Sequence, residues 1–136
     1  MTPQRIQRRR TKGWKMPENT ISVTRPGKWG NFLKLSGDMI MIDASYRRKN
    51  LDKWVFLCFG DLERLLEIYR LTMSGGGNTG GVIKLGVTSQ DGQQDLLWWH
   101  YKLAYCVDEL KGKHLACFCP IGSPCHAKIL LKIANQ

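Results

Sequence analysis

The C-terminal part of the chain constrains the fold more than any other stretch of the sequence. Residues 114–119 favour a strand, and the prolines and glycine of residues 120–124 predict a tight turn directly after it. A helix with Ser123 as its N-cap is expected from Pro124 onward, because apolar residues recur there at the spacing of one buried helix face. A strand, a turn and a helix in this order indicate an α/β protein, and open α/β sheets place their sites at the carboxyl end of a strand.

The rest of the chain alternates between short patterns typical of strands and longer patterns typical of helices. Strands are expected at residues 21–24, 39–42 and 82–87, and helices at residues 62–73 and 94–110. Asp61 is placed to cap the first of these helices, whereas the apolar run 54–59 fits either a buried strand or a helical turn. The alternation predicts a small parallel or mixed sheet with helices packed on it.

The length of the chain, 136 residues, is normal for one domain. Residues 1–19 are expected to form a basic arm, since Pro3 and Pro17 disfavour regular structure there, and residues 20–136 a single α/β domain. Residues 74–81 include five glycines and predict a flexible loop. This loop is not a P-loop, because no Gly-Lys-Ser or Gly-Lys-Thr follows it.

The apolar runs and the cysteines bear on the cellular compartment. The sequence contains no apolar run long enough for a transmembrane helix, and its N-terminus lacks the apolar core of a secretory signal. Three of the five cysteines lie within residues 117–125, unlike the even spacing of a disulfide framework. We therefore expect a soluble cytoplasmic protein without a membrane partner, in which the isolated Cys58 and Cys106 are buried apolar residues.

The clustered cysteines and the adjacent histidine are the main candidates for chemistry. Cys117 and Cys119 are two residues apart and would share one face of the expected strand. Cys125 and His126 fall in the first turn of the following helix, where the helix dipole favours negative charge. The four side chains together could bind a tetrahedral Zn²⁺.

Two other interpretations of this cluster stay open. A cysteine at a helix N-terminus is a better nucleophile because its thiolate is stabilised, so Cys125 and His126 are candidate catalytic residues. The cluster could also consist of structural thiols beside a capping histidine. One geometric argument counts against a metal site: neighbouring residues on a helix point about 100° apart, which makes it hard for Cys125 and His126 to reach one ion.

Positive charge is concentrated near the N-terminus. The formal net charge is +10, and residues 1–15 hold six Lys and Arg side chains and no acidic one. Such a field attracts polyanions, and neighbouring aromatic rings can stack on bases. The candidate nucleic-acid or phosphate-binding residues are Arg5, Arg8, Arg9, Arg10, Lys12, Trp14, Lys15, Arg25, Lys28, Trp29 and Asn31, with a further basic patch at Arg47, Arg48 and Lys49. Alternatively, the arm is solvated and Trp14 and Trp29 anchor loops onto the core.

Both ends of the chain carry motifs of a known family. The motifs are Gly112–Pro120, Pro124–His126 and Leu130–Asn135 at the C-terminus, and Thr2–Gln7, Arg9–Trp14 and Arg25–Asn31 at the N-terminus. They resemble an uncharacterised domain family of unknown function, number 4326, found in phages and bacteria. The resemblance implies a location in the cytoplasm of a bacterial cell. A more distant likeness to a second uncharacterised family implies a Rossmann-like or flavodoxin-like three-layer arrangement.

These observations favour a small basic protein of phage or bacterial type that binds nucleic acid or a nucleotide. In this interpretation Zn²⁺ is held by Cys117, Cys119, Cys125 and His126 and fixes the junction between the last strand and the last helix. One alternative is an enzyme that acts on a nucleotide or nucleic acid through the Cys/His pocket. A second alternative is a phage protein that binds and inhibits a host protein.

Overall fold

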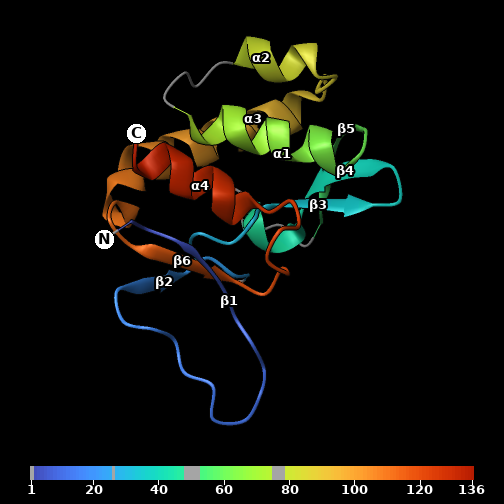
Figure 1. Ribbon diagram of the computed structural model, residues 1–136. Helices are drawn as coiled ribbons and strands as arrows, with labels where there is room; N and C mark the ends of the chain where they lie inside the picture. The colour runs from blue at the N-terminus through green and yellow to red at the C-terminus, as the bar shows by residue number, and fades with distance from the viewer. Residues whose placement is uncertain (1, 26, 48–52, 75–78) are drawn as a thin grey trace. The chain divides into compact units, whose positions relative to one another are not determined.

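The computed structural model describes residues 2–25, 27–47, 53–74 and 79–136 and confirms a mixed α/β protein (Figure 1). Its contacts divide the chain into two compact units. We call residues 1–31 and 107–136 the terminal unit, and residues 32–106 the central unit. In the described part of the chain, each unit contains one three-stranded sheet, parallel in the terminal unit and antiparallel in the central unit.

The terminal unit combines the two ends of the chain in one parallel sheet. Its elements are β1 (Arg5–Gln7), β2 (Thr20–Ser22), β6 (His114–Cys117) and α4 (His126–Ala134). The 3-10 segment η2 (Ala104–Leu110) comes directly before β6 in the chain, and its residues from Val107 onward belong to this unit. The strand order is β1-β6-β2, with Ile6 opposite Ala116 and Ile21 opposite Leu115. Helix α4 contacts β6 and β1 (Figure 1), and it buries Leu130 completely. The expected parallel sheet with a packed helix is therefore present here.

The basic arm predicted for residues 1–19 is wrong in one respect, because Arg5–Gln7 form strand β1. Pro3 lies before the strand and Pro17 lies in the connection to β2, so neither interrupts a ladder hydrogen bond. The strand is stabilised by pairing with β6, about 110 residues further along the chain, and not by any local pattern. Residues 8–19 form the long loop between β1 and β2 at the bottom of Figure 1.

The three strands of the terminal unit all end at the same edge of their sheet. Gln7 pairs with Cys117, and Ser22 pairs with Ala116, so the residues that follow these strands emerge side by side. The ladder continues for one further step, because the Arg8 amide donates to the Cys117 carbonyl at 2.8 Å. This edge brings together residues from three distant parts of the sequence.

The central unit is an antiparallel sheet covered by helices. Its elements are β3 (Leu33–Ser36), β4 (Met39–Ile42), η1 (Ala44–Tyr46), β5 (Val55–Phe59), α1 (Leu62–Met73), α2 (Thr79–Lys84) and α3 (Gln90–Leu103). The ambiguous run 54–59 is thus mainly strand. Gly37, with φ of 62°, opens the tight turn between β3 and β4. Asp61 caps α1 as expected, since its carboxylate accepts from the Arg64 amide. Helices α1 and α3 contact each other and the sheet.

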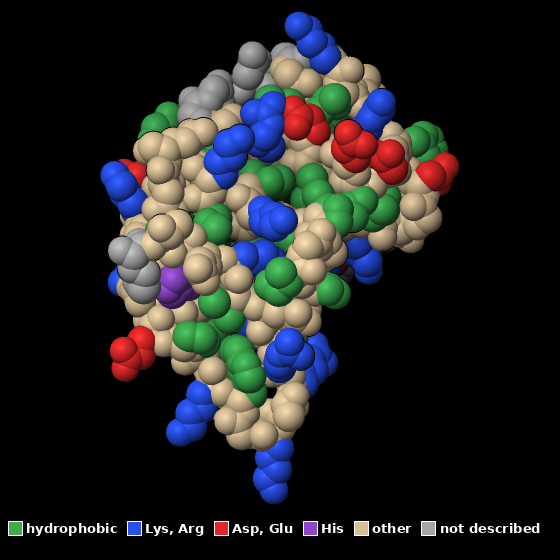
Figure 2. Space-filling view, viewed as in Figure 1, with side chains coloured by type: hydrophobic (Ala, Val, Ile, Leu, Met, Phe, Trp, Pro, Cys, Tyr) green, Lys and Arg blue, Asp and Glu red, His purple; other side chains and the backbone are tan. Residues whose placement is uncertain are grey.

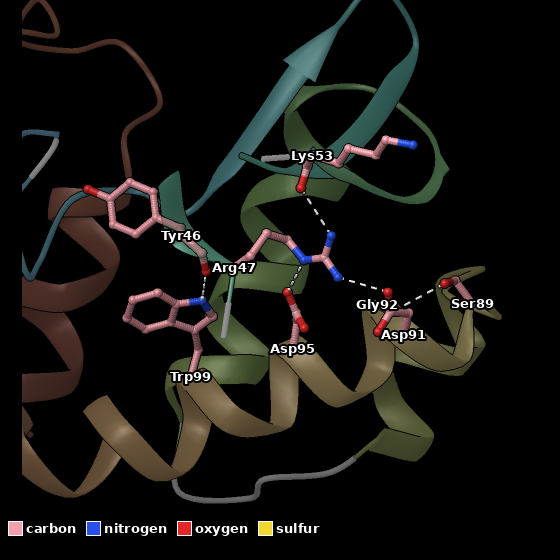
Figure 3. A network of polar contacts seen from close by, with 8 residues as sticks. All are labelled: Tyr46, Arg47, Lys53, Ser89, Asp91, Gly92, Asp95 and Trp99. Atoms are coloured by element: carbon pink, nitrogen blue, oxygen red, sulfur yellow. Dashed lines mark hydrogen bonds and ion pairs between the residues drawn. The ribbon is translucent and has the colours of Figure 1, made fainter. Parts of the chain in front are cut away.

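A buried ion pair joins Arg47, the residue that follows η1, to helix α3 of the central unit (Figure 3). Arg47 Nε donates to Asp95 Oδ2 at 2.6 Å, and Arg47 Nη2 lies 2.8 Å from Asp91 Oδ2. The Arg47 side chain is only 3% exposed and that of Asp95 is 0% exposed. Arg47 therefore belongs to the core of this unit and not to a basic surface patch; Arg48 and Lys49 lie outside the described residues.

Three other elements differ from their sequence predictions. The helix expected at residues 94–110 is instead the α-helix α3 from Gln90 to Leu103, followed by the 3-10 segment η2 from Ala104 to Leu110. The strand expected at 82–87 is wrong: Thr79–Lys84 form helix α2, which buries Val82 and leaves Ile83 and Lys84 exposed. The C-terminal helix begins at His126 and not at Pro124, and Cys125 takes the N-cap position. Of the glycine loop predicted at residues 74–81, residues 75–78 lie outside the described residues, and residues 79–81 are wrongly assigned because they belong to α2. No helix in the described part of the chain is long and apolar enough to cross a membrane.

Candidate metal centre

The candidate ligands lie where β6 ends and α4 begins. Cys117 is the last residue of β6, and Cys119 follows it by two positions. Cys125 has extended backbone angles, φ −153° and ψ 143°, so it precedes the helix that starts at His126. The predicted divergence of neighbouring side chains on a helix does not apply here, because only one of the two residues is helical. Cys125 Sγ in fact lies 3.7 Å from His126 Nδ1.

Three of the four candidates form a compact set. The ligand atoms of Cys117, Cys125 and His126 all lie within 4.8 Å of one another, and all three residues are buried. Around a tetrahedral Zn²⁺, two ligands are separated by about 3.8 Å when both are sulfur and by about 3.6 Å when one is imidazole nitrogen. The 3.7 Å between Cys125 Sγ and His126 Nδ1 is close to that second value. The set could therefore hold a metal ion.

The imidazole of His126 is oriented by backbone carbonyls at the end of β2. Its Nε2 atom lies 2.8 Å from the Val23 carbonyl oxygen and 3.2 Å from the Trp29 carbonyl oxygen. A carbonyl oxygen only accepts hydrogen bonds, so Nε2 carries a proton and donates to these carbonyls, and Nδ1 is the ring nitrogen that faces Cys125. Metal-binding histidines are commonly held in this way, with the second ring nitrogen donating to a carbonyl.

The two buried thiols of the set share a proton. The hydrogen bond with the Cys117 thiol lowers the pKa of Cys125 far below its ordinary value, against the opposing effect of burial, and His126 lowers it further. The same hydrogen bond and burial raise the pKa of Cys117. Cys125 is thus the thiolate and Cys117 the donor. A thiolate is the form of cysteine that binds metals and that acts as a nucleophile.

Cys119 lies at the margin of this set. Its Sγ atom is 3.7 Å from Cys117 Sγ, close to the separation of two thiolates on one Zn²⁺. Cys119 is half-buried, and it is not a member of the group whose ligand atoms all lie within 4.8 Å of one another. Its carbonyl oxygen accepts a hydrogen bond from Arg5 Nη2, which ties the turn after β6 to strand β1.

A pocket of about 320 Å³ opens beside the cluster. The strand ends explain its composition, because Arg10 follows β1, Thr24 and Arg25 follow β2, and Phe118 and Cys119 follow β6. The pocket is lined by Arg10, Thr24, Arg25, Asn31, Cys117, Phe118, Cys119 and His126. Three of the candidate metal ligands therefore face the same space as two arginines, and no lining residue is acidic.

The arginines after β1 gather around the Phe118 ring. The guanidinium carbons of Arg8 and Arg10 lie 4.7 Å and 4.5 Å from its centroid. Arg8 also donates to Ser22 and Thr24 hydroxyl oxygens at 3.0 Å and 2.7 Å, spanning from β1 to the end of β2. Arg5 Nε, Arg5 Nη1 and Arg8 Nε are buried without a hydrogen-bond partner in the described part of the chain. Arg5 and Arg8 are half-buried and Arg10 is exposed, so this region carries partly buried positive charge.

The other predicted nucleic-acid contacts are dispersed. Arg9, Lys12 and Lys15 are exposed on the loop 8–19, from which Lys and Arg side chains project in Figure 2, and Trp14 is half-buried there. Trp29 is buried, and its indole donates to Glu109, which also pairs with Lys28 at 3.0 Å. Trp29 thus anchors its loop, as expected in the alternative interpretation that Trp14 and Trp29 anchor loops onto the core.

Some pocket residues were missed by the sequence analysis. Thr24 and Phe118 had no assigned role, although each lies near the C-terminal end of a predicted strand and such positions meet at one edge of a parallel sheet. His100 and His114 lie outside the candidate set; His100 is buried in the central unit, where Nδ1 lies 2.8 Å from the Thr72 carbonyl oxygen. That contact gives His100 a structural role in the central unit.

The family resemblance is confirmed by comparison with family models. The model described as a domain of unknown function (DUF4326) matches residues 6–136, and the chain belongs to this family. No curated protein and no solved structure shows a significant match to the chain. The match covers both the parallel sheet and the Cys/His cluster, which places the candidate site within the family domain.

Proposed function

We propose that this DUF4326 protein is a zinc-containing binding module for nucleic acid or nucleotides. The observation that carries the proposal is the convergence of Cys117, Cys125 and His126 at the carboxyl edge of a parallel sheet. Two thiolates and an imidazole are ligands that Zn²⁺ prefers, whereas Mg²⁺ and Ca²⁺ prefer oxygen. An ion at this point would join β6 to α4 and fix the turn between them.

The basic loop supports the second half of the proposal. Arg9, Lys12 and Lys15 are exposed there, and the chain as a whole carries 21 Lys and Arg residues against 11 Asp and Glu. Exposed cations of this kind bind phosphates by releasing condensed counterions. Two further arginines line the pocket beside the cluster, so positive charge extends from the loop to the proposed zinc.

The test of nucleic-acid binding uses charge-removing variants of the exposed loop. The triple variant Arg9→Gln, Lys12→Gln, Lys15→Gln should bind labelled DNA more weakly, with the slope of log K against log salt shallower by about two to three for a duplex. A matched control replaces three exposed lysines elsewhere, Lys34, Lys84 and Lys132, and has the same net charge. If the wild-type protein has no affinity for DNA or RNA at low salt, the nucleic-acid part of the proposal is wrong.

One observation favours an enzyme as the second candidate function. Three protein ligands leave one position of a tetrahedral zinc for a water or a substrate, and zinc enzymes use this arrangement to activate water or polarise a substrate. Here two of the three proposed ligands, Cys117 and His126, line the pocket. The enzyme would act on a bound nucleotide or nucleic acid. Turnover of such a substrate that disappears with the zinc would establish this function in place of simple binding.

A further inference from the structure

We propose that the pocket beside the metal cluster binds a terminal phosphate monoester, the group offered by a free nucleotide or by the 5′ end of a nucleic-acid strand. The proposal rests on the proposed function and names the ligand chemistry of the same site. Its basis is the set of side chains that the strand ends bring around one space: Arg10, Arg25, Asn31 and Thr24, with the metal cluster along one side.

The donors in the pocket suit a phosphate group. Arg10 and Arg25 carry guanidinium groups, which bind phosphate with paired hydrogen bonds and cannot be neutralised near physiological pH. Asn31 adds an amide and Thr24 a hydroxyl, both of which can donate to phosphate oxygens. Because the lining contains no carboxylate, nothing in it would repel a dianion.

The proposed metal makes the same space more favourable to an anion. Two thiolates and one Zn²⁺ cancel in formal charge, so the metal centre would add no net negative charge beside the arginines of the pocket. The fourth position of the ion would be open to a phosphate oxygen, and arginines and metal ions both stabilise the negative charge of phosphoryl groups. Helix α4, nine residues long, also begins at His126, which places its positive end beside the pocket.

Partly buried arginines near the pocket point in the same direction. Arg8 and Arg10 lie against Phe118, and Arg5 and Arg8 have buried guanidinium nitrogens without a hydrogen-bond partner among the described residues. No acidic side chain in that part of the chain pairs with Arg5, Arg8 or Arg10. A buried cation is normally compensated by a counter-charge. A bound phosphate would supply that charge from the side of the pocket.

The size of the pocket favours an end group over an internal stretch of nucleic acid. Its volume of about 320 Å³ is at the lower limit for small-molecule sites. Such a space admits one phosphate with its sugar, and not a duplex. A terminal monoester also carries more negative charge than an internal diester, which matches two arginines and a metal better.

The test measures the contribution of the terminal phosphate to binding by the zinc-loaded full-length protein. Adenosine monophosphate is compared with adenosine, and a 5′-phosphorylated oligonucleotide with the same strand ending in a 5′-hydroxyl. We expect the phosphate to increase affinity at least tenfold in one of these pairs. If affinity differs only between adenosine monophosphate and adenosine, the ligand of the pocket is a free nucleotide. If affinity differs only between the two strands, the ligand is the end of a nucleic acid. Equal binding in both pairs overturns the proposal.

Matched variants assign the effect to the pocket. Arg10→Gln and Arg25→Gln should each reduce the preference for the phosphorylated ligand about tenfold or more. Lys132→Gln removes one exposed charge from the end of α4, does not line the pocket, and should keep the preference. If the preference persists in both arginine variants, the pocket is not its origin and the proposal is wrong.

Zinc content, measured on the same samples, separates this proposal from the proposed function. A zinc-loaded protein that does not distinguish the paired ligands overturns the phosphate site and leaves the zinc site standing. A protein without zinc that still prefers the phosphorylated ligand, and loses this preference in Arg10→Gln, supports the phosphate site and overturns the zinc site. A protein with neither property overturns both.

Discussion

The Nε2 atom of His126 lies 2.8 Å from the carbonyl oxygen of Val23, so the first residue of α4 is oriented by the residue that follows β2. The two residues are 103 positions apart in the sequence. Trp29, whose carbonyl oxygen also faces Nε2, is itself buried and bound to Glu109. The N-terminal half of the terminal unit therefore sets the direction of a metal ligand that the C-terminal half supplies.

The first prediction is that the purified protein contains about one zinc per chain. Cys117→Ser and Cys125→Ser should each abolish this content and lower thermal stability, because each removes one of three ligands. Metal is measured by mass spectrometry after extensive dialysis, and stability by thermal unfolding.

Cys58→Ser is the control for these variants. Cys58 is buried in β5 of the central unit, and burial raises the pKa of its thiol, so it stays protonated and does not compete for zinc. The zinc content of the Cys58→Ser variant should equal that of the wild type. A wild-type protein that contains no metal, with all thiols of the cluster free to react while folded, would contradict the prediction.

The second prediction concerns the Cys119→Ser variant, which shows whether the zinc site has three or four protein ligands. Cys119 Sγ lies near Cys117 Sγ, but it falls outside the compact set. The variant should retain one zinc and lose about tenfold in zinc affinity, as is typical for groups outside the set of direct ligands. Affinity is measured by competition with a chelator. A loss as large as that of Cys117→Ser would instead identify Cys119 as a fourth ligand.

The sequence was sufficient to find the Cys/His cluster, because its four residues lie close together in the sequence. Cys117, Cys119, Cys125 and His126 fall within ten positions, and the strand, turn and helix around them have clear local patterns. The orientation of His126 could not be predicted, since it depends on carbonyls of a distant loop. Strand β1 could not be predicted either, because three residues carry no period and its stability comes from pairing with β6.

Elsewhere, local patterns gave the wrong answer for an identifiable reason. Residues 82–87 contain β-favouring Val82, Ile83 and Val87, yet the contacts of α2 with α1 and α3 favour a helix there, and tertiary packing overrides propensity.

Three consecutive basic residues at 47–49 suggested a surface patch. The partner of Arg47 is Asp95, 48 positions away, and no local rule connects the two.

This buried pair gives the third prediction. Asp95→Asn should lower the free energy of unfolding by about 3–5 kcal/mol, because it leaves the Arg47 guanidinium buried beside a neutral group (Figure 3). Asp91→Asn is the matched control: the Asp91 side chain is 53% exposed, and its ion pair with Arg47 should contribute about 1 kcal/mol or less. Urea unfolding followed by tryptophan fluorescence compares the two. Equal losses would mean that burial does not decide the strength of this network.

The fourth prediction concerns protons released when zinc binds. The hydrogen bond between the two thiols lowers the pKa of Cys125 and raises that of Cys117, so the metal-free protein holds one thiolate and one thiol. Both must be thiolates when they bind zinc. Zinc binding at pH 8 should therefore release about one proton, and zinc affinity should fall about tenfold for each unit by which the pH drops.

Calorimetry measures this number directly. Zinc is titrated into the metal-free protein in two buffers that differ in ionisation enthalpy, and the difference in observed heat gives the protons released. Cys117→Ala is the informative variant, since it removes the donor of the hydrogen bond that holds Cys125 as a thiolate. In this variant Cys125 should react more slowly with iodoacetamide at pH 6 than in metal-free wild type. A release of two protons by the wild type would show that both thiols are protonated before zinc binds, and that the hydrogen bond between them does not stabilise a thiolate.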